Sequence, residues 1–183
     1  GTQASALTAA QRIAFDILDK ISVALSCHLK IGNPKSATFD GFWYKNSRRK
    51  SDGLHERVTT EIDAGNRGLL ALYDLHLDTT KELPEKAGFL RAIKEYRNSS
   101  THRFTVIHNE YMGLRDTESK LLDHEHVTEF EALTLSSLRL ARASLFYFCD
   151  AINLSEDLKP SPEDALILSH HVLDHDYFSG MDD

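Results

Sequence analysis

The chain has 183 residues but only two cysteines, Cys27 and Cys149, which are too far apart to form a Cys-x-x-Cys pair. Each lies in an apolar helical stretch, and we interpret both as reduced, buried thiols of a cytoplasmic protein. No apolar run has the length that a bilayer-spanning helix needs, and the first residues show no signal-peptide pattern. The sequence therefore predicts no membrane partner and no disulfide framework.

An excess of positive charge is also absent, because 21 Lys and Arg stand against 28 Asp and Glu, for a net charge of −7. This balance argues against nucleic-acid binding through bulk electrostatics, so any such function must come from a local site. The hydrophobic share of 41% is ordinary for a globular protein. We predict a single domain over residues 1–183, with a core over about 8–155 and a short helix and acidic tail over 156–183.

Signals for β-strands are weak, because no Asn-Gly or Asp-Gly turn lies between alternating strands. Apolar residues at spacings of three and four instead predict an all-α fold, a bundle of four long helices with a short extra helix. Gly65 and Gly68 are expected to weaken and bend the second helix. The expected helices cover about residues 8–29, 54–77, 84–107 and 127–153, and the extra helix covers about 162–173. The expected core stripes include Ile13, Ile17, Ile21, Ala24 and Leu25 in the first helix and Phe130, Leu133, Leu138, Ala141, Leu145, Phe148 and Ile152 in the fourth.

The third predicted helix carries the run Arg97-Asn98-Ser99-Ser100-Thr101-His102. When residues 89–107 are projected on a helix, Arg97 falls at the margin between an apolar and a polar side. The apolar side contains Phe89, Ile93, Tyr96, Ser100, Phe104 and Ile107. The polar side contains Arg91, Lys94, Asn98 and His102. A histidine on a polar face beside cations is presented to a ligand rather than to the core.

This pattern suits phosphodiester chemistry. Arg97 supplies a permanent charge and a planar fork for phosphate oxygens, and His102 can accept and donate a proton near neutral pH. Asn98 lies four residues before His102 and can position the imidazole or a phosphate. RNA brings its own nucleophile, the 2′-hydroxyl, so neither a metal nor a protein nucleophile is required. The alternative is a solvated helix surface, because Arg and His at this spacing also occur by chance.

The run resembles the Arg-polar-x3-His signature of the HEPN superfamily, with Asn98 in the polar position. The resemblance implies a bundle of four or five helices with the motif on a late core helix, and a homodimer whose two motifs face each other across a cleft. It also implies metal-independent endoribonuclease activity in toxin, antiphage defence or RNA-processing systems, with 2′,3′-cyclic phosphate and 5′-hydroxyl products. The sequence His102-Arg103-Phe104 is similar to a subgroup found C-terminal to helical repeats, which implies a fused or associated regulatory domain. Some members carry a modified Tyr where this chain has Phe104, so neutralisation by modification at that position is not expected.

A second candidate for RNA binding is the run from Phe42 to Lys50, in which aromatic residues stand beside cations. These residues can stack bases and track phosphates. The alternative, which we favour, is a loop whose aromatic residues pack on the bundle while its charged side chains remain in water. The RNA-binding candidates are Arg48, Arg49 and Lys50 here, together with Arg91, Lys94 and Arg103 near the motif.

Histidine-rich segments offer a further alternative, a metal site. The run from Asp123 to His126 precedes the fourth helix, and His171 and His175 are four residues apart near the C-terminus. No His-Glu-x-x-His motif occurs, and Glu-x-x-His is absent, so we expect no metal and no cofactor. We therefore predict a homodimeric, metal-independent endoribonuclease with Arg97, Asn98 and His102 at its catalytic site. The alternative is a non-catalytic HEPN-type module for dimerisation or ligand sensing.

Overall fold

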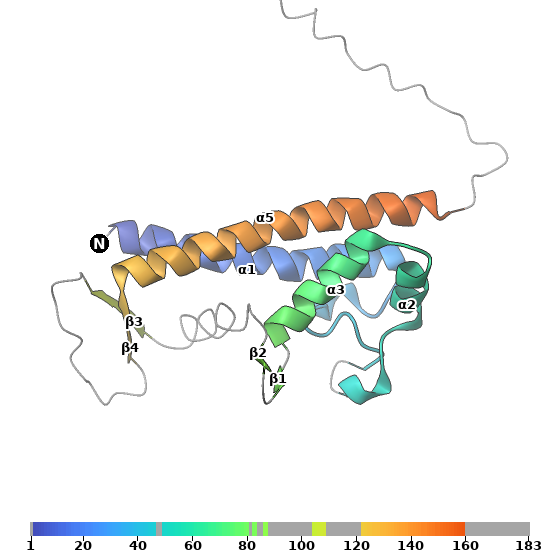
Figure 1. Ribbon diagram of the computed structural model, residues 1–183, viewed down its shortest axis with the longest axis horizontal. Helices are drawn as coiled ribbons and strands as arrows, with labels where there is room; N and C mark the ends of the chain where they lie inside the picture. Colours follow the sequence, from blue (N-terminus) through green and yellow to red (C-terminus); the bar gives the residue numbers. More distant parts are fainter. Residues whose placement is uncertain are drawn as a thin grey trace, which may run out of the picture.

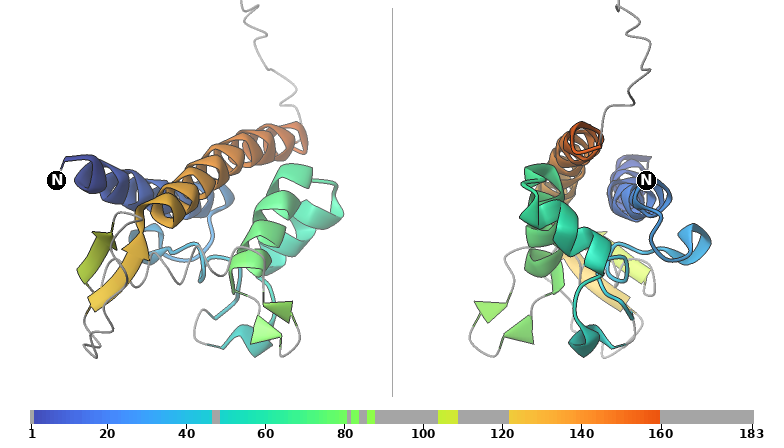
Figure 2. Two further views of the ribbon diagram at one scale, coloured as in Figure 1. Left: turned by 60° about the vertical axis from the view of Figure 1, so that its left-hand side comes forward. Right: turned by 90° about the vertical axis from the view of Figure 1, so that its right-hand side faces the viewer.

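Two long helices form the spine of the protein in the computed structural model. They are α1 (Thr2–Leu29) and α5 (Val127–Asp157), which lie side by side and run in the same direction (Figure 1). Two shorter helices, α2 (Glu56–Asp63) and α3 (Arg67–Thr80), follow each other, and α3 packs against α5 (Figure 2). The predicted all-α fold is confirmed. The structure describes residues 2–46, 49–80, 82–83, 86–87, 104–108 and 122–159, with side chains for 5–46, 49–80 and 126–159.

The buried face of α5 is formed largely by small side chains. They recur at spacings of three, four and seven, and they are Thr134, Ser137, Ala141, Ser144, Ala151 and Ser155. The hydroxyl of Ser144 donates to the Leu140 carbonyl oxygen at 2.8 Å, and the hydroxyl of Thr134 donates to the Phe130 carbonyl oxygen at 2.8 Å. Because these hydroxyls bond within their own helix, neighbouring helices can approach closely while the polar atoms stay paired.

Three residues of the predicted core stripes are exposed, and these assignments were wrong. Ile13 is 60% exposed, Leu138 is 43% exposed and Leu145 is 44% exposed. The stripes were drawn through the largest apolar residues, whereas close packing of the helices buries small polar residues on an adjacent face. The two cysteines were also misassigned, since Cys27 and Cys149 are both exposed.

The second predicted helix is two helices, because the chain breaks at residues 64–66. Gly65 has φ +98°, a left-handed conformation that favours glycine. Asn66 then caps α3, since its side-chain oxygen accepts the backbone N–H of Leu69 at 3.0 Å. The same side chain donates to the carbonyl oxygen of Ala151 at 2.9 Å and to Glu61 Oε2 at 3.3 Å. Asn66 thereby joins α2, α3 and α5, and it is 1% exposed.

Replacing Asn66 with alanine is expected to lower the free energy of unfolding by about 2–4 kcal/mol, from the loss of a helix cap and of buried hydrogen bonds. Urea denaturation measures the change. Asn33→Ala is the matched control, because Asn33 is an exposed cap whose oxygen accepts the Lys35 N–H at 3.1 Å. We expect that control to cost less than about 1 kcal/mol. Equal losses in the two variants would contradict the joining role of Asn66.

Two short 3-10 helices, Pro34–Ser36 and Lys50–Asp52, and four short strands complete the described elements. Strands β1 (Glu82–Leu83) and β2 (Lys86–Ala87) are antiparallel, whereas β3 (Phe104–His108) and β4 (Leu122–His126) are parallel, with Phe104 opposite Leu122. The third helix predicted from Pro84 to residue 107 is therefore wrong at both ends. Phe104-Thr105-Val106-Ile107 is an aromatic and β-branched run that favours a strand, and the helical projection does not apply to it.

The remaining helix predictions stay predictions. The segment 88–103, which contains the Arg97–His102 motif, and the predicted C-terminal helix over 162–173 lie outside the described residues. Among the helices that the structure describes, none combines the length and apolar character needed to cross a bilayer.

Candidate functional site

Most of the predicted site residues lie outside the described part of the chain. This is true of the three catalytic candidates and of four of the RNA-binding candidates. They are Arg97, Asn98, His102, Arg91, Lys94, Arg103 and Arg48. Their assignment therefore continues to rest on the sequence.

The loop after α1 is described except for residues 47 and 48, and it distinguishes between the two interpretations of the aromatic run. Phe42 is 5% exposed and Trp43 is fully buried, so these rings pack on the helices. Arg49 and Lys50 are exposed, and the Lys50 ammonium lies 5.4 Å from the centre of the Tyr44 ring. The favoured interpretation is confirmed for the aromatic residues, while two of the predicted RNA-binding cations are accessible to a ligand.

Sequence reasoning missed His76, a fully buried residue of α3 around which the aromatic rings gather. Its imidazole stacks with Trp43 at 28° and with Tyr73 at 29°. Its Nε2 lies 3.2 Å from the Tyr44 hydroxyl, and its Nδ1 lies 3.6 Å from Asp40 Oδ1. The available signal was the spacing of Tyr73 and His76, which are one helical turn apart. This spacing does not predict a cluster by itself, because the loop aromatics that complete the cluster are distant in the sequence.

The electrostatics of this cluster follow from its burial. Desolvation raises the pKa of the Tyr44 hydroxyl, and the neighbouring Tyr73 and Asp40 raise it further. Tyr44 therefore stays protonated at neutral pH, and its oxygen and His76 Nε2 can share one proton. Because Asp40 lies beyond the other ring nitrogen, the Tyr44 hydroxyl and the Asp40 carboxylate can together hold the imidazole in one tautomer.

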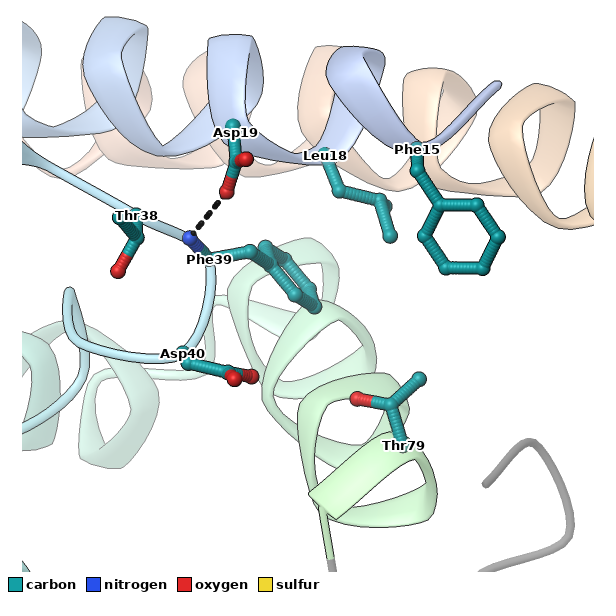
Figure 3. Close-up of a pocket in the computed structure, with 7 residues that line it drawn as sticks. All are labelled: Phe15, Leu18, Asp19, Thr38, Phe39, Asp40 and Thr79. Atoms are coloured by element: carbon teal, nitrogen blue, oxygen red, sulfur yellow. Dashed lines mark hydrogen bonds between the residues drawn. The ribbon is translucent and has the colours of Figure 1, made fainter. Parts of the chain in front are cut away.

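A cavity of about 220 Å³ opens next to this cluster, between α1, the loop and the end of α3 (Figure 3). Asp19 fixes the loop against α1, since its Oδ1 accepts the Phe39 N–H at 2.9 Å. The carboxylate of Asp40 is on the wall of the cavity, and its side chain is 45% exposed. This arrangement positions the loop through two separate carboxylates, Asp19 and Asp40, and the buried His76 imidazole, and it leaves the Asp40 carboxylate accessible to solvent.

The histidine-rich segments give no described set of metal ligands. Asp123 lies in β4, where only the backbone is described, and His171 and His175 lie outside the described residues. His126 precedes α5 as its N-cap, with no side-chain capping bond. These segments therefore add nothing to the site.

Comparison with known proteins identifies a family. The model of the family described as LA2681-like HEPN matches residues 1–155, a span that includes α1, α2, α3, most of α5 and the Arg97–His102 motif. No curated protein matches the chain, and no solved structure matches it.

Proposed function

Because the chain belongs to the LA2681-like HEPN family, we propose that it is a metal-independent endoribonuclease. The observation that carries this proposal is the Arg97-Asn98-x3-His102 motif inside the matched span. Such modules serve in toxin, antiphage defence or RNA-processing systems, and we place this chain among them. The second candidate, a non-catalytic dimerisation or ligand-sensing module, predicts the same fold without cleavage.

The proposed site is composite and is shared by two copies of the chain. Cleavage by the 2′-hydroxyl requires one group to remove its proton and another to protonate the 5′-oxygen that leaves. One motif supplies only a single histidine, His102, and a twofold axis supplies the second. Arg97 binds the scissile phosphate and stabilises its charge in the transition state, while Asn98 positions one of these groups. Arg91, Lys94 and Arg103 extend the phosphate-binding surface.

We expect the purified chain to cleave RNA in the presence of EDTA and to leave 2′,3′-cyclic phosphate ends. Gel analysis of a labelled RNA shows the cleavage. Phosphatase treatment then identifies these ends, because the phosphatase removes the phosphate only after the 2′,3′-cyclic ring has been opened. Arg97→Lys, prepared in parallel, is expected to lose most of the activity, because a point charge cannot reproduce the two-pronged phosphate contact. It also controls for contaminating nucleases. Cleavage that stops in EDTA and returns with zinc or magnesium would overturn the metal-independent mechanism, and absence of cleavage would favour the non-catalytic module.

A further inference from the structure

A second cavity lies beside the loop that follows α1. It has a volume of about 210 Å³ and is enclosed by the end of α1, the loop that follows and His55. We call it the loop cavity. Hydroxyl and amide groups line much of it, from Ser26, Asn33, Ser36 and Thr38, and the Tyr44 side chain forms part of the wall. The Ser36 hydroxyl donates to the Asn33 carbonyl oxygen at 3.3 Å, and the other groups can donate hydrogen bonds to the oxygens of an anionic ligand.

His55 borders the loop cavity, and one of its ring nitrogens has no hydrogen-bond partner among the described residues. Its backbone N–H donates to the Trp43 carbonyl oxygen at 2.9 Å, which fixes its position. Its side-chain Nδ1 is buried and makes no hydrogen bond in the described structure. Leaving such an atom unpaired costs about 1–3 kcal/mol, so a rotation of the ring that brings Nδ1 to a ligand in the cavity is favoured. His55 is also the N-cap residue of α2, without a side-chain capping bond.

Lys45 gives the loop cavity its charge. It is the one Lys or Arg among the described lining residues, and none of those residues is Asp or Glu. Its ammonium pairs with Glu56 Oε1 at 3.0 Å, but the Lys45 and Glu56 side chains are 46% and 86% exposed. A pair this exposed is weak, so Lys45 can turn to another anion. Residues 45–57 contain five Lys or Arg and two Asp or Glu, a local charge of +3 in a chain of −7.

We propose that the loop cavity binds a phosphoryl group, with Lys45 as its charge partner and His55 Nδ1 as a hydrogen-bond donor. Phosphate oxygens accept several hydrogen bonds at once, which suits a wall rich in hydroxyl, amide and imidazole donors. The apolar side chains of Ile31 and Phe42 also line the cavity and give a ribose a surface to pack against. An RNA strand and a free nucleotide both present this chemistry. The expectation that RNA supplies the phosphoryl group rests on the proposed ribonuclease function. Binding of a phosphoryl group in the loop cavity does not depend on that function.

The test titrates the full chain, carrying His102→Ala to prevent cleavage, with inorganic phosphate, adenosine 5′-monophosphate and a single-stranded RNA. Imidazole ¹⁵N resonances report on His55, and calorimetry gives the dissociation constants. Loss of one charge-assisted hydrogen bond corresponds to about 1.5–3 kcal/mol, so we expect Lys45→Met and His55→Phe each to weaken binding at least about tenfold. Lys35→Met is the matched control, since Lys35 is an exposed lysine outside the cavity lining, and it should leave binding unchanged. Glu56→Gln should tighten binding, because it releases Lys45 from its carboxylate partner.

The outcomes separate this proposal from the proposed function. Phosphate titration that leaves the His55 resonances unmoved, or equal binding by Lys45→Met and Lys35→Met, would overturn the loop cavity as a phosphoryl site even if the chain cleaves RNA. Binding of phosphate and mononucleotide that is lost in Lys45→Met would support the cavity, and if the chain with His102 intact also fails to cleave RNA, the nuclease is rejected while the cavity stands. Stronger binding of RNA than of the mononucleotide identifies RNA as the source, and the reverse order identifies a free nucleotide. If His55→Phe fails to fold, Lys45→Met still tests the proposal, because Lys45 is exposed and its replacement should not disturb the fold.

Discussion

Replacing His102 with alanine is expected to lower RNA cleavage by at least about a hundredfold, because general acid–base catalysis typically contributes 10²–10⁴ to the rate. In the composite site the substitution removes both the group that accepts the 2′-hydroxyl proton and the group that donates to the 5′-oxygen. The loss should therefore appear in kcat rather than in the affinity for RNA. Cleavage of a labelled RNA under single-turnover conditions measures it.

A structural role for His102 would give a different result, and thermal unfolding distinguishes the two. The motif places His102 on the polar side of its predicted helix, where a substitution should change stability by no more than about 0.5 kcal/mol. His76→Ala is the contrasting variant, because His76 is fully buried and contacts Trp43 and Tyr44. We expect His76→Ala to lower the melting temperature clearly, through the cavity that it leaves. If His102→Ala unfolds the chain, then the residue is part of the core and the catalytic assignment fails.

Replacing Gly68 with alanine is expected to destabilise the fold by more than about 3 kcal/mol, beyond the usual cost of overpacking. A Cβ atom at Gly68 would lie 2.3 Å from the backbone nitrogen of Ala151 and 2.6 Å from the carbonyl oxygen of Tyr147. Both atoms belong to the α5 backbone, so they cannot turn aside as a side chain can. Relief of the contact requires α3 and α5 to separate. Helix propensity acts in the opposite direction, since alanine is favoured over glycine by about 1 kcal/mol, and the packing effect must exceed it.

Urea denaturation of Gly68→Ala tests the close approach, with Gly32→Asn as the matched control. Gly32 has φ +59°, and an added Cβ there meets no atom within 4 Å. Asparagine tolerates this left-handed conformation, so the control should cost less than about 1 kcal/mol. A Gly68→Ala protein as stable as the original chain would show that α3 and α5 do not touch at this position.

The sequence was sufficient to predict the helical fold class and the family. The three- and four-residue spacing of apolar residues predicted α1 and α5, and Arg97-Asn98-x3-His102 indicated the family that the match over residues 1–155 establishes. These features are local, because a helical period and a six-residue motif are both read from neighbouring positions. The break between α2 and α3 was readable in part, since Gly65 was expected to weaken that segment. The helix cap at Asn66, which begins α3, was not predicted.

Tertiary contacts decided what local patterns could not. The burial of Ser144 and the exposure of Leu145 depend on how closely helices approach, and this distance is a property of paired surfaces rather than of one helix. His76 is the centre of the aromatic cluster because the fold brings Trp43 and Tyr44, which are more than 30 residues away in the sequence, into contact with it. Phe104 lies in β3 because Leu122–His126 provides a partner strand, and a strand needs such a partner, whereas a helix satisfies its hydrogen bonds within its own segment.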